Sequence, residues 1–123
     1  MYLKDKERDD MRKRPLITVY ITNHNYGRFL KKSIDSVLAQ TMKDFELIII
    51  DDGSTDNSRG IIRAYEGEKN TRTIFQKNKG LNITNNIALR SARGEFIVRL
   101  DADDYLDKNA LLLMSNALKD NDE

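Results

Sequence analysis

The sequence predicts an α/β fold built on a parallel sheet, and two features of the chain lead to this prediction. Short apolar and β-branched runs alternate four times with segments in which apolar residues recur at helical spacing, the pattern of strand–helix units joined by right-handed crossovers. Polar residues also gather after every expected strand. Because the carboxyl ends of parallel strands lie at one edge of a sheet, a single polar site is expected along that edge.

The first half of the chain is expected to supply two strands and two helices. The β-rich run Leu16–Thr22 predicts the first strand, and turn residues separate it from a helix over Arg28–Gln40. The run Phe45–Ile50 is apolar at almost every position, which is typical of a strand buried on both faces. Asp56 is expected to cap a short helix over Ser58–Glu66.

The second half repeats the alternation. Strands are expected at Thr71–Gln76 and Phe96–Leu100, and helices at Leu81–Ala92 and Asn109–Lys119. The residues of the third helix that are expected to face inward are Ile83, Ile87 and Ala88. In the last helix, Leu111–Met114 is a run of consecutive apolar residues, more than one helix face can bury. This run predicts self-association or contact with further sequence.

Composition narrows the function classes. A chain of 123 residues suits one domain, expected at residues 15–123 after a disordered, charged leader at 1–14. A net charge of +1 gives no bulk attraction for nucleic acid. The absence of cysteine excludes a disulfide framework, and a single histidine argues against a zinc site. No apolar run reaches the roughly 20 residues of a membrane span.

The most informative stretch is the acidic end of the fourth expected strand. Asp101 and Asp103 are two residues apart and would share one face if the strand continued through them. Adjacent carboxylates repel each other unless a cation lies between them, and Mg²⁺ or Mn²⁺ with oxygen ligands is the natural partner. A single aspartate here would suit a helix cap. With Asp104, the acidic group after a buried strand instead favours a metal site.

A second acidic pair, Asp51 and Asp52, follows the second expected strand. Asp51 ends that strand and is expected to accept a hydrogen bond from a ligand. Asp52 fits equally well the tight turn that an Asp-Gly pair favours. His24 and Lys79 lie in neighbouring loops, where local hydrogen bonding and plain solvation explain them as well as ligand contact does.

Several nucleotide-binding motifs are absent from the sequence. There is no Gly-x-x-x-x-Gly-Lys segment and no Gly-x-Gly-x-x-Gly after the first strand, which argues against a P-loop and a dinucleotide fold. Phosphatases that form an aspartyl phosphate carry Asp-x-Asp after the first strand, whereas here it follows the fourth. A metal-dependent phosphatase or nucleotidyltransferase remains an alternative, which release of phosphate or pyrophosphate would identify.

In combination, these segments resemble the nucleotide-binding half of the family 2 glycosyltransferases, which have the GT-A fold. The resemblance covers residues 16 to about 118 in matching order and spacing. The matching segments are 17–25, 33–41, 45–56, 78–81, 92–97 and 100–104. Each segment is short, but the series is specific.

The resemblance implies a Rossmann-like GT-A sheet of strand order 3-2-1-4 with helices on both faces, truncated before the acceptor half. It also implies a nucleotide-diphosphate sugar donor, expected to be a UDP-sugar. The donor-binding residues carried over by the resemblance are Thr22, His24, Asn25, Asp51, Asp52, Lys79, Asp101, Ala102 and Asp103. Of these, Asp103 and Asp101 form the DXD motif that would bind Mn²⁺ or Mg²⁺ at the diphosphate.

The expected function is therefore the donor-binding part of an inverting, metal-dependent glycosyltransferase. Transfer to an acceptor hydroxyl of a glycan or lipid-linked glycan, for example in cell-surface polysaccharide synthesis, would take place in the cytoplasm or, for the full-length protein, at the cytoplasmic face of the membrane. The catalytic base is expected downstream of Glu123, so the chain alone is expected to be inactive. The alternative is a nucleotide-binding module without transferase activity.

The sequence departs from the family pattern at two sites in the expected donor region. The family commonly has Tyr-Asn after the first strand, where this chain has His24 and Asn25. It often has Arg-Asn in the third helix, where this chain has Asn85 and Asn86. The second departure removes a cation near the diphosphate or base.

Overall fold

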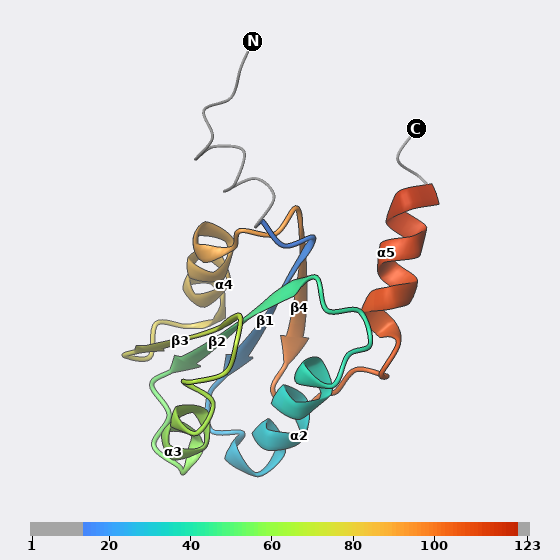
Figure 1. Ribbon diagram of the computed structural model, residues 1–123. Helices are drawn as coiled ribbons and strands as arrows, with labels where there is room; N and C mark the ends of the chain where they lie inside the picture. The colour runs from blue at the N-terminus through green and yellow to red at the C-terminus, as the bar shows by residue number, and fades with distance from the viewer. Residues whose placement is uncertain (1–13, 121–123) are drawn as a thin grey trace.

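The computed structural model describes residues 14–120, which form a four-stranded parallel sheet of order β3-β2-β1-β4 (Figure 1). The elements are β1 (Ile17–Asn23), α2 (Gly27–Leu38), β2 (Phe45–Asp52), α3 (Ser58–Arg63), β3 (Thr71–Gln76), α4 (Leu81–Ser91), β4 (Phe96–Asp101) and α5 (Ala110–Asp120). The expected strand order is confirmed, and every expected element is present with small shifts at its ends. The predicted leader lies outside the described residues apart from Arg14.

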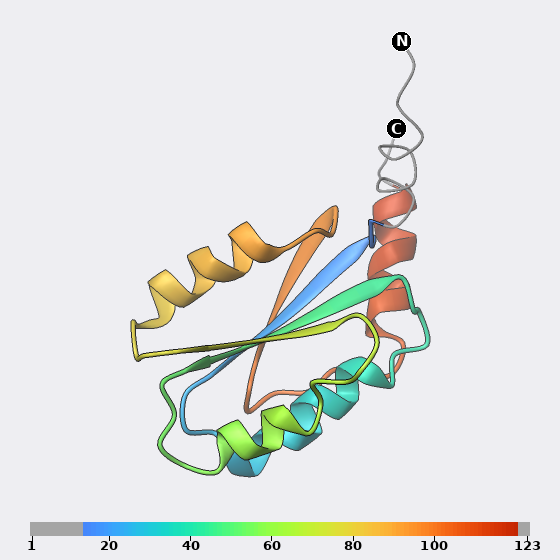
Figure 2. The same cartoon turned by 60° about the vertical axis from the view of Figure 1, so that its left-hand side comes forward.

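Helices cover both faces of the sheet, as the resemblance implied (Figure 2). Alternate residues of each strand point to opposite faces. One face packs against α2, α3 and the start of α5, and the other packs against α4. The larger cluster includes Val19, Leu47 and Ile62, while the α4 side holds a smaller cluster around Ile48 and Ala88. The strands nearest the centre, β1 and β2, are therefore buried on both sides.

One expectation about element detail is wrong, and one condition set in the sequence analysis is not met. Ile83 was expected to face the core but is 49% exposed, and Thr84 is buried beside Ala88 instead. Strand β4 ends at Asp101, so the strand does not continue to Asp103. The amide of Asp104 donates to the carbonyl of Asp101 at 2.9 Å, which turns the chain directly after the strand.

The segment after β4 is tied to the end of α2 by polar side chains. Gln40 is fully buried, its Nε2 donates to the carbonyl of Asp107 at 2.7 Å, and its Oε1 accepts from the amide of Leu111 at 3.0 Å. The Oγ of Ser36 accepts from the amide of Leu106 at 3.0 Å. These bonds fix the path of the chain after the turn at residues 101–104, which we call the acidic turn. The segment that follows this turn is therefore anchored to α2 and to the residues just after it.

A buried carboxylate fastens the opposite, amino-terminal edge of the sheet. Glu46 accepts hydrogen bonds from the Oγ1 of Thr18 and the amide of Arg93, both at 2.6 Å, and pairs with the Nη2 of Arg72 at 2.9 Å. Burial alone would raise the pKa of Glu46, but these hydrogen bonds and the Arg72 charge outweigh it and lower the pKa. Among residues 14–120, no helix has the length and apolarity to cross a membrane.

Candidate functional site

A cleft of about 420 Å³ opens at the carboxyl edge of the sheet, where the expected polar site should lie. It lies between the ends of β1, β2 and β4 on one side and the loop leading into α4 on the other. The residues that line it are Thr22, Asn23, His24, Tyr26, Asp52, Asn78, Gly80, Leu81, Thr84, Arg99, Asp101, Ala102 and Asp103. This location outside the strand ends is the usual ligand position in open α/β sheets.

The pleat of β2 separates the paired aspartates. Asp51 lies on the face covered by α2 and α3, and Asp52 lies on the α4 face, because successive side chains of a strand alternate. Only Asp52 lines the cleft. Strand β2 extends to this residue because its pairing with β3 continues through Asp52 and Gln76. The residue pattern favoured Asp51 for the ligand contact and left Asp52 between a turn and a ligand role, while the resemblance assigned both aspartates to donor binding.

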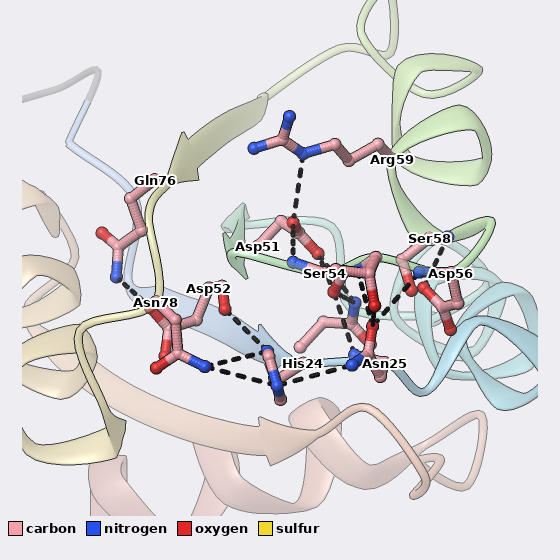
Figure 3. A network of polar contacts seen from close by, with 12 residues as sticks. His24, Asn25, Asp51, Asp52, Ser54, Asp56, Ser58, Arg59, Gln76 and Asn78 are labelled. Atoms are coloured by element: carbon pink, nitrogen blue, oxygen red, sulfur yellow. Dashed lines mark hydrogen bonds and ion pairs between the residues drawn. The ribbon is translucent and has the colours of Figure 1, made fainter.

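Asp51 is fully buried, and it belongs to the polar network that joins the ends of β1 and β2 (Figure 3). Its Oδ1 accepts from the Nδ2 of Asn23 at 2.9 Å and from the Oγ of Ser54 at 2.6 Å, and its Oδ2 accepts from the Ser54 amide at 3.0 Å. The Nε of Arg59 lies 3.6 Å from Oδ2. Asp51 therefore joins β1, α3 and the turn after β2, and its contact with a ligand stays a prediction.

Asp52 organises the loop that forms one wall of the cleft. Its Oδ1 accepts from the amide of Lys79 at 2.7 Å and from the Nε2 of Gln76 at 3.0 Å, and its Oδ2 accepts from the amide of Gly80 at 3.1 Å. Burial opposes ionisation of Asp52, but these hydrogen bonds outweigh burial and hold its pKa below the usual value. Asp52 therefore both holds the backbone of the loop before α4 and lines the cleft.

The loop after β1 is shaped by its own polar contacts (Figure 3). The Nδ1 of His24 donates to the carbonyl of Asp52 at 2.7 Å, which leaves the ring against the cleft. Asn25 has a left-handed backbone with φ of 60°, and its Oδ1 accepts from the amides of Thr55 and Asp56 at 2.7 and 3.2 Å. Asn25 therefore binds the loop after β2, whereas His24 lines the cleft.

The acidic turn presents two carboxylates in different states. The Oδ1 of Asp101 pairs with Arg99, whose Nη2 is 3.0 Å away and whose Nε is 3.1 Å away. Asp103 is exposed and makes no side-chain hydrogen bond or ion pair within residues 14–120. Both residues line the cleft even though only Asp101 belongs to the strand.

The carboxylate oxygens of this turn suit a hard divalent cation whose remaining coordination positions are filled by a bound ligand and water. Across residues 14–120, no three acidic or histidine side chains gather into a preformed metal cage. Two carboxylates with free oxygens, Oδ2 of Asp101 and both oxygens of Asp103, are what Mg²⁺ or Mn²⁺ needs when waters and phosphates complete its shell. The turn therefore suits a metal that arrives with a phosphorylated ligand.

The predicted donor-binding residues divide into two sets. Those that line the cleft are Thr22, His24, Asp52, Asp101, Ala102 and Asp103, and those outside its lining are Asn25, Asp51 and Lys79. Sequence reasoning had given no role to Arg99, Tyr26 or Thr84. The signal for Arg99 was its spacing: it stands two residues before Asp101 on one strand, so both must share a face.

Comparison with known proteins identifies the family. Residues 18–123 match the sequence profile described as Glycosyl transferase family 2. That match spans most of the chain, and the chain therefore belongs to this family. The GT-A architecture and the nucleotide-sugar-binding character of the region follow from the family and from the fold described above.

Individual relatives agree with this assignment. The chain is 47% identical over 90 residues to an uncharacterized glycosyltransferase of Nostoc sp., a match that covers 72% of this chain and 28% of that protein. It is 40% identical over 100 residues to a chondroitin synthase of Escherichia coli, covering 80% of this chain and 15% of that protein. The chain thus spans less than a third of the length of these curated relatives.

Solved structures show the same sheet. The S. aureus TarS fragment 1–349 in complex with UDP-GlcNAc superposes with a TM-score of 0.79 at 27% identity, covering 85% of this chain and 31% of that one. The mannosyltransferase PcManGT from Pyrobaculum calidifontis, in complex with GDP-Man and Mn²⁺, gives a TM-score of 0.73 at 27% identity over 86% of this chain and 32% of that one.

Proposed function

We propose that this chain is the donor-binding part of an inverting, metal-dependent glycosyltransferase that uses a UDP-sugar. The observation that carries the proposal is the cleft at the carboxyl ends of β1, β2 and β4. Thr22 and His24 lie in the middle of this cleft, with the carboxylates of Asp101 and Asp103 on the β4 side and that of Asp52 on the β2 side. The family assignment supports it, as does the UDP-GlcNAc complex of a similar structure.

Each side chain has a proposed part in holding the donor. Thr22, His24 and Asp52 would line the base pocket, Asp101 would hold the ribose or the metal, and Asp103 would be the direct metal ligand. A uracil ring suits a carboxylate at this position, because its imide N–H can donate to an acceptor-only group. Bound Mn²⁺ or Mg²⁺ would supply electrostatic stabilisation of charge on the leaving diphosphate.

Sugar transfer by the whole protein would need a base for the acceptor hydroxyl. Within residues 14–120, the cleft carboxylates are committed: Asp52 to the loop amides, Asp101 to Arg99, and Asp103 to the proposed metal. The 123-residue chain is therefore proposed to bind donor with little transfer. We also propose a role in polysaccharide synthesis, in line with a chondroitin synthase among its relatives, in the cytoplasm or at the cytoplasmic face of the membrane.

Calorimetric titration of the chain with UDP, ADP and GDP in the presence of Mn²⁺ tests the proposal. UDP is expected to bind more tightly than the other two. Equal or reversed affinities would remove the uridine assignment, and failure of every nucleotide diphosphate to bind would overturn the donor-site proposal. Release of inorganic phosphate or pyrophosphate from a nucleotide substrate would instead favour a phosphatase or nucleotidyltransferase.

A further inference from the structure

A second hollow lies beside the cleft, on the outer face of α2. This α2 groove has a volume of about 560 Å³ and is lined by Arg28, Lys31, Lys32, Asp35, Ser36 and Tyr105. Tyr26 and Asp103 line the cleft. Arg28 and Tyr105, which follow them by two residues each, line the groove. The α2 groove therefore begins at the acidic turn, on the side of the cleft where the metal is proposed to bind.

The α2 groove carries positive charge that the neighbouring carboxylates do not neutralise. The Nζ of Lys31 lies 2.6 Å from the Oδ2 of Asp35, so these two charges offset each other. Within residues 14–120, Arg28 and Lys32 form no ion pair, although the acidic turn leads directly into Tyr105. They stand four residues apart on α2 and so share one face, a turn apart. Two neighbouring cations without a carboxylate partner favour an anionic ligand.

Each of these cations lies over an exposed aromatic ring. The Nζ of Lys32 is 3.9 Å from the ring centroid of Tyr105, and the Cζ of Arg28 is 4.7 Å from that of Phe29. The rings themselves are 59% and 40% exposed. A sugar ring has an apolar C–H face that packs against an aromatic ring, and a carboxylated sugar adds an anion for a cation beside that ring. A helix face that only meets water needs no exposed rings.

The amount of charge and the shape of the surface separate a glycan from a membrane. Anionic lipid surfaces are recognised by clusters of about four to eight lysines and arginines. The α2 groove has two cations without a carboxylate partner, and it is hollow rather than flat. A discrete chain that lies in the groove fits these features better than a lipid surface does.

We propose that the α2 groove binds an acidic glycan, a chain of carboxylated sugars, and that this glycan is the acceptor. Arg28 and Lys32 pair with its carboxylates, and Tyr105 packs against a sugar ring. Because the groove begins at the acidic turn, a chain bound there places its end next to the proposed metal and donor sugar. The inference rests on the proposed function, since a bound glycan is an acceptor only if the cleft holds a nucleotide sugar.

Calorimetric titration with a hexasaccharide of galacturonic acid tests the inference, and its uncharged methyl ester is expected to bind about tenfold more weakly. Arg28→Gln and Lys32→Gln should each weaken the acid about three- to fivefold, and together about ten- to twentyfold, as for exposed ion pairs. Tyr105→Leu should weaken the hexasaccharide but not hexaglutamate, which has no sugar ring. The double variant Lys69→Gln with Arg90→Gln removes the same charge from exposed positions outside the groove and should bind like the wild type.

Several results would overturn the inference. Equal affinity for the acid and its methyl ester would remove the charge contact, and hexaglutamate binding as tightly as the hexasaccharide would remove the sugar contact. An equal loss in the Lys69 and Arg90 control would assign binding to overall charge. Phosphatidylserine vesicles that bind through Arg28 and Lys32, while the hexasaccharide does not bind, would assign the groove to a membrane. Thermal melting confirms that each variant folds.

The nucleotide titration keeps this inference separate from the proposed function. A wild-type chain that binds UDP but not the hexasaccharide would refute the acidic glycan alone. Failure to bind any nucleotide diphosphate would instead count against the proposed function, and with it against the acceptor role of a glycan that still binds in the α2 groove.

Discussion

Replacement of Asp52 by alanine should loosen the wall of the cleft and lower the stability of the fold at once. The carboxylate accepts hydrogen bonds from the Lys79 and Gly80 amides and from Gln76 at 2.7, 3.1 and 3.0 Å. A hydrogen bond to a charged group contributes about 1.5–3 kcal/mol. Lys79 and Gly80 are exposed, so water can replace part of the loss. We therefore expect the free energy of unfolding to fall by about 2–3 kcal/mol.

Urea unfolding at neutral pH and calorimetric titration with UDP measure the two effects. Asp52→Ala should lower UDP affinity as well as stability, because the loop over residues 77–80 loses its anchor. Asp52→Asn keeps an acceptor oxygen for the Lys79 amide and should lose about 1 kcal/mol. Asp56→Ala is the matched control: Asp56 accepts from the amides of Gly27 and Ser58, both at 2.9 Å, outside the cleft.

The control should lose stability and keep its UDP affinity. An Asp52→Ala chain that unfolds at the wild-type urea concentration would show that the three hydrogen bonds add nothing net, and the reasoning would fail. If Asp52→Ala is measurably destabilised but binds UDP as tightly as the wild type, the loop over residues 77–80 does not contribute to UDP binding. Asp52 would then not belong to the proposed base pocket.

Three further predictions concern the metal, acid stability and association. Asp103→Ala should abolish the effect of Mn²⁺ on UDP binding while Asp104→Ala has a smaller effect, and Mn²⁺ dependence that survives Asp103→Ala in calorimetry would place the metal elsewhere. The pKa of Glu46 lies below its usual 4.5, so the stability that its ionised carboxylate contributes is complete above that pH and is lost as pH falls through the lowered value. In urea unfolding, the difference in free energy of unfolding between the wild type and Glu46→Gln should therefore shrink in acid. A difference that stays constant from pH 7 to 3 would contradict this. Light scattering across a dilution series should detect self-association through Leu112 and Leu113, which are 39% and 66% exposed; Leu113→Lys should weaken it, and a wild-type monomer at high concentration would refute it.

The local pattern of the sequence was enough to find the elements of this fold. Strand and helix periodicities depend on neighbours within a few residues, so the alternation and the burial of Phe45–Ile50 could be read directly from the chain. The clustering of polar residues after the strands predicted the site at the correct edge of the sheet. The strand order followed from the family resemblance, since order depends on crossovers that periodicity does not encode.

Tertiary structure decided which side chains meet inside the cleft. Pairing with β3 carries β2 on to Asp52, and the pleat then directs Asp51 into the α2 and α3 layer and Asp52 toward α4. The inward face of α4 was also beyond the pattern. Apolar residues recur at helical spacing on more than one face. Thr84 faces inward, where its hydroxyl accepts from the Nε2 of Gln76 on β3 at 2.9 Å and donates to the Gly80 carbonyl at 2.8 Å.

The same distinction holds for Arg99. Its period-two relation to Asp101 is visible in the sequence, but its place in the cleft depends on β4 lying beside β1 and on α4 covering that face. A strand's own residues determine only that alternate side chains share a side. Which side becomes the wall of a cleft is set by the neighbouring strands and helices, because long-range packing fixes the phase that local spacing leaves free.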